Sequence, residues 1–392
     1  MMREHVSCAI VGGGITGLTC ARGLAAAGFD DFTLLTDEVG GRIKASPVGG
    51  VNMGAYYVRS DYAEVLQVAT RLRRIPLGRI SFEAQGRTFA VTAMLRRHPL
   101  LALRFLRELV RYNRHYQRLA ARFTRTCQKE AIESDAYFHA LYRQPCREWL
   151  REARLEALAP YFEAVVRGTT ICTLDEASAA VCLNSFLIVL YGAFEYRFDA
   201  DKVSAPLADK LALERVVAVA PAADGWRLTT SSGARMSCEF LVLALPLAQI
   251  NELVDTGYEE HGRVTVHCWH VRGTLRPEYA GRHWHVFAAA GDDVCFGRQV
   301  DDSFIFYSKN RQADLSRYFA AHETLAFKTW APAFNVSADL FPMRQRENLL
   351  CLTDYNVTGL EDSARIGRYG AHSVLGYWSA RSARRPAQAT AS

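Results

Sequence analysis

The chain has 392 residues, 49% of them hydrophobic and 22% charged, and a formal net charge of +6. This composition is typical of a soluble globular protein with room for two domains. No apolar stretch is long enough to span a membrane, and the first predicted strand starts at His5, which leaves no room for a secretory signal. The ten cysteines include no CxxC pair, so we expect buried, reduced thiols in a cytoplasmic protein, with no disulfide and no zinc site.

The N-terminal segment has the pattern of a strand, a glycine turn, a helix and a second strand. The apolar run His5–Val11 leads into a GxGxxG turn, a helical pattern covers Thr16–Ala27, and a second apolar strand covers Phe32–Thr36. A lone GxGxxG is weak evidence, but this context is the one that a dinucleotide site requires. The segment therefore predicts a dinucleotide-binding domain.

Each glycine of the turn has its own role. Gly12 permits the tight turn after the strand, Gly14 lets the backbone approach the phosphates, and Gly17 lets the helix pack on the strand. The helix begins at Thr16, directly after Ile15, so its N-terminus and these two residues lie at the bound anion.

A second glycine turn contains Gly40, Gly41 and Arg42, and the segment VNMGA follows with Gly54 and Ala55. These residues resemble the GGR turn and the later Gly-Ala segment of the flavin amine oxidase superfamily, which includes monoamine oxidases, protoporphyrinogen oxidases and phytoene-type desaturases. The resemblance implies FAD, with Arg42 at its phosphates and Gly54 and Ala55 close to the flavin. NAD alone is the alternative, but a nicotinamide enzyme has no use for this second turn.

The resemblance implies an α/β protein with a Rossmann-like FAD-binding domain and a discontinuous α+β substrate domain of antiparallel sheet and helices. In most relatives a Glu at the end of the second strand binds the adenosine ribose. Thr36 stands there in this chain, and we assign the ribose contact to Asp37. The FAD-binding domain is expected in residues 1–61, 201–255 and 344–375, the substrate domain in 62–200 and 256–343, and a disordered tail in 376–392.

The first part of the expected substrate domain reads as a hairpin followed by helices. The hairpin should turn at Gln85 and Gly86, and the region from Pro99 to Gly192 is mostly helical, with a break at Pro160. The helix after Pro99 has an apolar stripe on one face and an arginine stripe on another. The apolar stripe consists of Leu101, Phe105, Leu109, Tyr112, Tyr116, Leu119 and Phe123, and the arginine stripe of Arg104, Arg107, Arg111, Arg114, Arg118, Arg122 and Arg125.

The arginine stripe has two interpretations. It is either a solvated helix face, or a docking site for an acidic carrier protein with a tethered substrate, an anionic membrane surface or a partner subunit. Nucleic acid is not expected, because the net charge is modest and no recognition motif accompanies the stripe.

The middle of the chain returns to strands. Residues 214–233 resemble the family's segment near the adenine, where we assign Val217, with Val216 as the alternative. Residues 263–309 predict short antiparallel strands, and GRVTVHCWHVRG resembles the strand on which many amine oxidases carry a lysine near flavin N5. Val266 or His267 takes that place, which puts oxygen-linked amine oxidation in doubt. The neighbouring histidines lack the spacing of metal ligands, so no metal site is expected.

Near the C-terminus, a strand, an aspartate and a helix resemble the family's last FAD segment. The resemblance implies that Asp354 binds the ribityl chain or pyrophosphate. It places Leu360, Glu361 and Ala364 under the flavin ring. No cysteine stands at a plausible attachment site, so we expect noncovalent FAD.

Five residues are candidates for the chemistry or for substrate binding. Tyr307, Trp330 and Tyr355 lie in segments that resemble those facing the flavin, His267 is a possible proton acceptor, and Arg59 could clamp a carboxylate. The expected function is hydride transfer from an amine or amino-acid-like substrate to flavin N5, with reoxidation by oxygen. A desaturase or tailoring dehydrogenase acting on a C–C or C–N bond of a larger, carrier-bound biosynthetic intermediate is the first alternative, and a non-catalytic FAD-binding partner subunit is the second.

Overall fold

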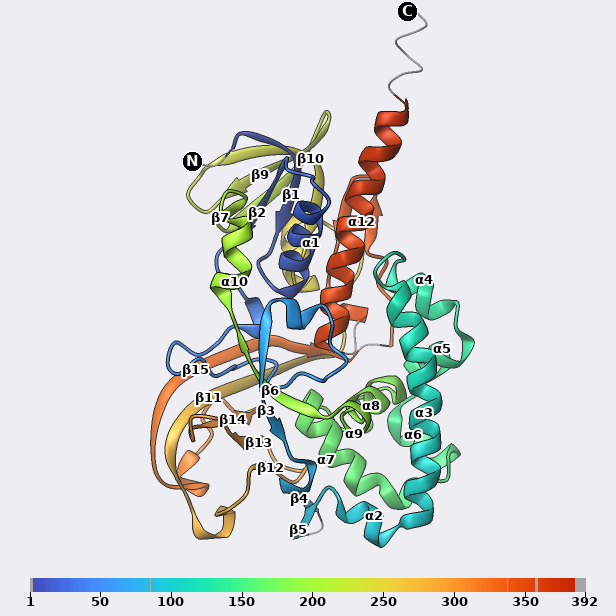
Figure 1. Cartoon of the computed structure of the whole chain (residues 1–392), viewed down its shortest axis with the longest axis vertical. Coiled ribbons are helices and arrows are strands. Elements are labelled where there is room, and N and C mark those ends of the chain that lie inside the picture. Colours follow the sequence, from blue (N-terminus) through green and yellow to red (C-terminus); the bar gives the residue numbers. More distant parts are fainter. Residues whose placement is uncertain (1–2, 85, 337, 357–358, 385–392) are drawn as a thin grey trace, which may run out of the picture.

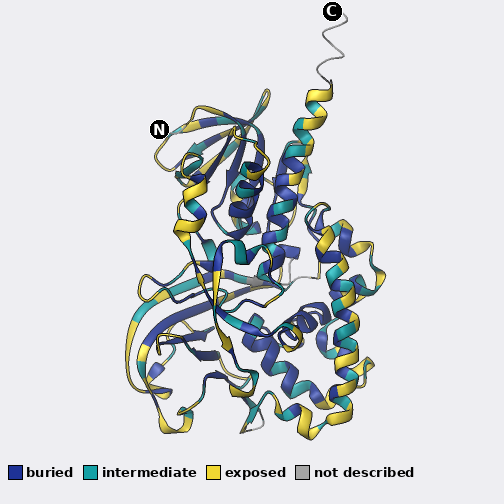
Figure 2. Cartoon of the chain, in the orientation of Figure 1, coloured by how far each residue is buried: buried dark blue, intermediate teal, exposed yellow. Residues whose placement is uncertain are grey.

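The structure is a computed structural model that describes residues 3–84, 86–336, 338–356 and 359–384. Two sheets lie one above the other in Figure 1, and a cluster of helices lies beside the lower sheet. The two long helices of the upper part, α1 (Ile15–Ala26) and α12 (Leu360–Arg384), lie side by side. Figure 2 shows that buried residues line the interior of both parts.

The upper sheet is the expected dinucleotide-binding sheet. Its strands are β1 (His5–Val11), β2 (Phe32–Thr36), β7 (Leu211–Leu213), β8 (Val216–Ala222), β9 (Gly225–Thr230), β10 (Arg235–Leu243), β16 (Arg344–Arg346) and β17 (Leu349–Cys351). The order is β16-β17-β10-β1-β2-β7, with β9 paired to β10 and β8 paired to β9. Strands β17, β10, β1, β2 and β7 are parallel, so their carboxyl ends meet at one edge, where ligands bind in sheets of this kind.

The contact between α1 and α12 is very close. A Cβ added to Gly367 of α12 would lie 2.3 Å from the carbonyl oxygen of Thr16. This close approach fixes the two helices against each other.

The prediction of a disordered tail from residue 376 is wrong for residues 376–384, because α12 continues to Arg384. Tyr377 packs on Phe240 with ring centroids 5.1 Å apart, and Arg381 forms an ion pair with Glu239 of β10. Residues 385–392 lie outside the described part of the chain.

The lower sheet is mostly antiparallel. Its strands are β4 (Ile80–Ala84), β5 (Arg87–Ala90), β11 (Arg263–Leu275), β12 (Trp284–Val286), β13 (Asp293–Arg298), β14 (Phe304–Ser308) and β15 (Phe319–Asn335). Their order is β15-β11-β14-β13-β12-β4-β5, and β3 (Ala69–Ile75) and β6 (Ala193–Phe198) form a separate pair. The hairpin of β4 and β5 is confirmed, with Gln85 outside the described residues. The strands of the upper sheet lie within residues 1–61, 201–255 and 344–375, and those of the lower sheet lie within 62–200 and 256–343. The domain boundaries stay a prediction.

The helices fill the region predicted to be helical. They are α2 (Ala93–Arg97), α3 (Pro99–Arg122), α4 (Gln128–Glu133), α5 (Ala136–Arg143), α6 (Cys146–Glu152), α7 (Ala159–Thr170), α8 (Ala179–Ser185) and α9 (Ile188–Tyr191), with α10 (Ala200–Ser204) and α11 (Leu247–Leu253) further on. The apolar stripe of α3 is buried as predicted, apart from the half-buried Leu101. Pro160 lies in the first turn of α7, where proline is tolerated, so the break in the helical region falls between the end of α6 at Glu152 and the start of α7 at Ala159.

All ten cysteines are buried free thiols. Among the described helices, none combines the length and the apolar character that crossing a membrane requires.

Candidate functional site

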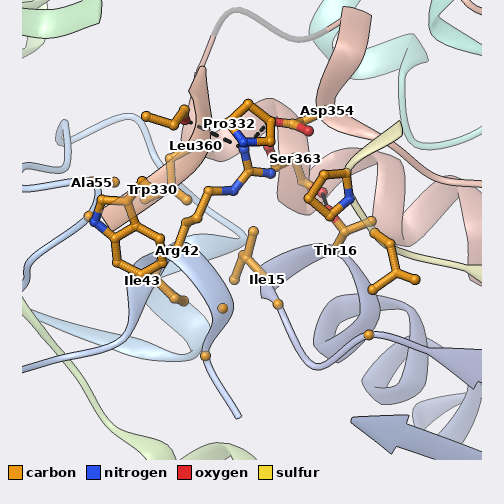
Figure 3. Close-up of a pocket in the computed structure, with 18 of the residues that line it drawn as sticks. Ile15, Thr16, Arg42, Ile43, Ala55, Trp330, Pro332, Asp354, Leu360 and Ser363 are labelled. Atoms are coloured by element: carbon orange, nitrogen blue, oxygen red, sulfur yellow. Dashed lines mark hydrogen bonds and ion pairs between the residues drawn. The ribbon is translucent and has the colours of Figure 1, made fainter. Parts of the chain in front are cut away.

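A cavity of about 530 Å³ runs between the two sheets and the helical cluster. At one end it is lined by the two glycine turns and the carboxyl edge of the upper sheet. At the other end it is lined by aromatic side chains of the lower sheet and by residues of α7 and α8. Part of its wall is drawn in Figure 3.

The first glycine turn opens the N-terminus of α1 to the cavity. Gly12 has φ of +112°, and a Cβ there would lie 2.3 Å from the carbonyl oxygen of Ala244, so no larger residue fits. Gly14 precedes α1 with no capping hydrogen bond from a side chain, and the first turn of the helix contains no acidic residue. A Cβ on Gly14 would meet nothing within 4 Å. The first N–H groups of α1 are therefore available to an anion in the cavity.

The second glycine turn touches the first. The Gly40 N–H donates to the Gly13 carbonyl at 2.8 Å, and Gly14 and Gly40 form an isolated parallel bridge. Gly54 has to be glycine for a different reason, since a Cβ there would lie 1.8 Å from the carbonyl oxygen of Arg42. The two glycine turns are separated in the sequence, but together they form one continuous stretch of backbone along the cavity.

Arg42 and Asp354, both assigned to the cofactor, lie together in the cavity wall. Arg42 Nη1 is 2.7 Å from Asp354 Oδ2 (Figure 3). Burial opposes the charge on Arg42, but Asp354 outweighs it and raises the pKa of the guanidinium. The other carboxylate oxygen, Asp354 Oδ1, is buried with no hydrogen-bond partner among the described residues. This pair offers a fixed positive charge and a free acceptor beside the glycine turns.

The start of α12 forms the wall next to this pair. Leu360 and Ser363 line the cavity, and Thr16 Oγ1 donates to the Ser363 carbonyl at 2.9 Å (Figure 3). The prediction that Glu361 and Ala364 lie under the flavin does not fit this geometry, because neither lines the cavity. Glu361 turns away and accepts hydrogen bonds from the backbone N–H groups of Ala63, Glu64 and Val65 at 2.8–3.1 Å.

The end of β2 is built around Thr36. Its hydroxyl accepts from the Gly13 N–H at 3.0 Å and donates to the Glu38 carbonyl at 2.6 Å, so it supports the first turn. Asp37 is exposed and lines the cavity, and its contact with the ribose stays a prediction. Val217 is 50% exposed and outside the cavity, whereas Val216 lines it. The assignment of Val217 is therefore corrected to Val216, because neighbouring residues of a strand face opposite ways.

Three side chains of the lower sheet line the far end of the cavity. The Tyr307 hydroxyl donates to the Gly54 carbonyl at 2.9 Å, and Trp330 Nε1 donates to the Met53 carbonyl at 2.7 Å. Both aromatic residues are thereby fixed to the loop that carries Gly54. Val266 also lines the cavity and is 1% exposed.

His267 lies on the opposite face of β11 from Val266. Its Nδ1 is 2.9 Å from Thr329 Oγ1, and its ring stacks on Phe327 at 6.0 Å between centroids. Burial lowers the pKa of His267. Val266, and not His267, therefore lines the cavity, and His267 cannot reach it as a proton acceptor. That Val266 takes the place of the relatives' lysine stays a prediction.

Two other candidates also lie outside the cavity lining. Arg59 is buried and forms a bidentate pair with Asp61 at 2.9 and 3.0 Å, so it is neither a surface residue nor free to clamp a carboxylate. Tyr355 is 2% exposed, and its hydroxyl accepts a long hydrogen bond of 3.5 Å from the His261 N–H. Both residues serve the protein core.

The far end of the cavity has further lining residues that the sequence analysis did not single out. Thr169, Thr170 and Ile171 come from the end of α7, and Asn184 and Ser185 from the end of α8. The charged residues among the described lining residues are Asp37, Glu38, Arg42, Glu214, Arg215, Glu252, Lys328 and Asp354. All but Lys328 come from the upper sheet and the segments around it. Lys328 belongs to β15 of the lower sheet, where its Nζ lies 5.2 Å from the centroid of the Trp330 ring and 3.6 Å from Glu38 Oε1.

The histidines considered as metal ligands have other partners. His270 lies between the hydroxyls of Ser46 and Ser303 at 2.9 and 2.8 Å, and His285 contacts Glu83 at 3.0 Å. Within the described ranges, no three His, Cys, Asp or Glu residues gather in a way that could hold a metal ion.

Comparison with known proteins decides the family. The model of the flavin-containing amine oxidoreductase family matches residues 15–264. The chain belongs to this family. It is a flavin-dependent oxidoreductase, and the resemblance seen in its glycine turns is confirmed.

Solved structures share the fold of this flavin-dependent oxidoreductase. Putrescine oxidase bound to putrescine has a TM-score of 0.68 at 15% identity, with 95% of this chain and 99% of that chain covered. Cyclohexylamine oxidase from Brevibacterium oxydans has a TM-score of 0.65 at 13% identity, with 95% and 99% covered. A fatty acid isomerase from P. acnes has a TM-score of 0.63 at 14% identity, with 96% and 100% covered. No curated protein matches the sequence.

Proposed function

We propose that this oxidoreductase binds FAD noncovalently and oxidises a substrate whose reacting end carries no charge. The observation that carries the proposal is the cavity, which runs from two adjoining glycine turns to an aromatic end. The charged side chain nearest this aromatic end among the described lining residues is Lys328, and Glu38 neutralises it at 3.6 Å. Its volume of about 530 Å³ lies in the range of ligand sites.

The residues at the glycine end fit FAD. The open space beside Gly14 and the uncapped start of α1 suit a pyrophosphate. Arg42 would contribute positive charge to the phosphates, and the unpartnered Oδ1 of Asp354 would accept from a hydroxyl of the ribityl chain. Noncovalent binding is supported by the cysteines, since Cys295 is the one cysteine that lines the cavity and burial raises its pKa to about 12. A thiol of that pKa is a poor nucleophile.

A bound flavin supplies a two-electron acceptor that takes a hydride from the substrate carbon. The protein positions the substrate and keeps water out. Tyr56, Tyr307 and Trp330 form an aromatic wall, in which hydrogen bonds to the backbone hold Tyr307 and Trp330 in place. Such a wall orients an apolar group at low entropic cost.

The uncharged far end narrows the substrate class. Putrescine oxidase and cyclohexylamine oxidase are named for amines, so a neutral amine is the first candidate. An amino acid is disfavoured, because Arg59 is paired with Asp61, and Lys328, the cation beside Trp330, is paired with Glu38. Desaturation of a C–C or C–N bond in a larger, carrier-bound intermediate is the second candidate, favoured by Val266 in place of a lysine beside the flavin.

Anaerobic titration of the purified protein tests the proposal through the flavin absorbance. An apolar monoamine such as cyclohexylamine should bleach the flavin, faster as the pH rises toward the pKa of the amine, whereas putrescine and free amino acids should react far more slowly. Reduction by free amino acids would contradict the assignment of an uncharged site. Bleaching by none of the amines, but by an acyl substrate, would favour the desaturase, and no bleaching by any substrate would favour the non-catalytic subunit.

A further inference from the structure

The outer face of the helical cluster exposes leucines in an unusual number. Leu100, Leu103 and Leu106 of α3 are 81%, 66% and 40% exposed, and Leu95 of the preceding helix α2 is 60% exposed. In Figure 2 exposed residues follow the outer side of α3 and α2 at the lower right. On a helix, residues three apart are neighbours, so the three leucines of α3 form one apolar patch over its first two turns.

Arginines continue this face toward the other end of α3. Successive residues of a helix are turned by about 100° around its axis. Six side chains therefore point within about 60° of the direction opposite the buried Phe105: Leu100, Leu103, Arg107, Arg111, Arg114 and Arg118. All four arginines are exposed. Their common surface with Leu100, Leu103 and Leu106 is called here the leucine–arginine face.

The charge of this face is almost uncompensated. Arg107 pairs with Glu108 at 3.6 Å, and Arg111 lies 4.3 Å from the centroid of the Tyr137 ring. Within the described residues, no carboxylate forms an ion pair with Arg111, Arg114 or Arg118. Three residues of the predicted stripe do not share the face. Arg104 is half-buried, Arg122 donates to Ser134 at 2.7 Å, and Arg125 lies beyond the end of the helix.

We propose that the leucine–arginine face docks on an anionic lipid bilayer, with α3 lying in the plane of the membrane surface. Its 24 residues form a rod of about 36 Å. The leucines would enter the boundary between headgroups and acyl chains, while the arginines would contact lipid phosphates. An acidic carrier protein would account for the arginines, but the highly exposed leucines at one end of the same face favour lipid, because only an apolar phase rewards their burial.

The docking face lies one helix away from the far end of the cavity. On its buried side, Phe105 of α3 contacts Phe162 of α7 and Phe186 beside α8, each at 4.8 Å between ring centroids. The ends of α7 and α8 line the cavity. Docking would therefore bring the far end of the cavity toward the membrane, although the proposal does not depend on which substrate the enzyme oxidises.

Vesicle sedimentation of the flavin-loaded enzyme tests the proposal. The probes are vesicles of phosphatidylcholine alone and vesicles that also contain phosphatidylglycerol. We expect binding to the anionic vesicles that weakens with salt. The double variant Arg111→Glu/Arg118→Glu should bind the anionic vesicles at least about 25-fold more weakly, since each arginine contributes about fivefold to the affinity. The double variant Leu100→Ser/Leu103→Ser should bind them about tenfold more weakly.

Matched controls lie on the upper sheet, far from α3 in Figure 1. Leu213 is 67% exposed and Arg235 is exposed, so Leu213→Ser with Arg235→Glu changes the same residue types without touching the face. This control should bind like the wild type, and all variants should keep the flavin spectrum. No binding to anionic vesicles, or equal binding by face variants and control, would overturn the proposal. A salt-sensitive complex with a purified acidic acyl carrier protein in place of vesicles would also overturn it.

Discussion

Gly14 separates cofactor binding from folding more cleanly than any other position in the glycine turns. Its φ of −74° and ψ of 178° suit any residue, and a Cβ there would meet no atom within 4 Å. We therefore expect Gly14→Val to leave the free energy of unfolding of the flavin-free protein within about 0.5 kcal/mol of the wild type. The two added methyl groups would occupy the space beside the first N–H groups of α1.

The loss of affinity follows from the hydrogen bonds that the valine blocks. If two N–H groups of α1 lose their contact with the pyrophosphate, at about 1.5–3 kcal/mol for each bond to a charged group, FAD affinity falls by about 10² to about 10⁴-fold. The measurement is fluorescence titration of flavin-free protein with FAD, together with urea unfolding. Gly78→Val is the matched control, since Gly78 also has open space around its Cβ and lies far along the chain from the turns. Wild-type affinity in Gly14→Val would refute the placement of the pyrophosphate, and an unfolded variant would refute the claim of open space.

Three further predictions concern the far end of the cavity and the core. Val266→Lys should speed reoxidation of the photoreduced enzyme by oxygen at least about tenfold in stopped flow, because a buried cation stabilises the developing negative charge; fast wild-type reoxidation unchanged by the substitution would contradict the position of β11. Arg59→Met should cost about 3–5 kcal/mol of stability in urea unfolding by leaving Asp61 unpaired, and Asp61→Asn in the same chain should recover part of it, while a shifted flavin spectrum would contradict a purely structural role. Burial lowers the pKa of His285 to about 4, against the opposing effect of Glu83, whereas the unfolded histidine titrates near about 6.5. Above about pH 6.5 the free energy of unfolding should therefore not depend on His285, and it should fall by up to about 3 kcal/mol as the pH drops from about 6.5 to about 4. If His285→Gln loses as much stability over the same pH range, the loss has another source.

Local patterns predicted the glycine-turn end of the cavity well. A glycine turn between a strand and a helix depends on backbone geometry within a few residues, and Gly12, Gly14 and Arg42 all line the cavity. The direction of single side chains was less predictable. A shift of one residue turns a strand residue to the other face, which explains why Val216 and Val266 line the cavity in place of Val217 and His267.

Distant contacts caused the remaining errors. Glu361 was predicted to lie under the flavin, but the backbone N–H groups of residues 63–65 hold its carboxylate outside the cavity. Arg59 became a core residue because Asp61 and Asn184 surround it. The length of α12 depends on packing with β10. None of these partners is visible from spacing alone, since tertiary contacts override local tendencies.

The central claim is noncovalent FAD in the cavity between the two sheets. The most direct measurement is acid precipitation of the purified yellow protein, followed by chromatography of the supernatant. We predict that the flavin is released, that it elutes as FAD, and that it amounts to about one molecule per chain. Colour retained in the pellet, release of FMN, or a colourless protein that does not bind added FAD would contradict the account.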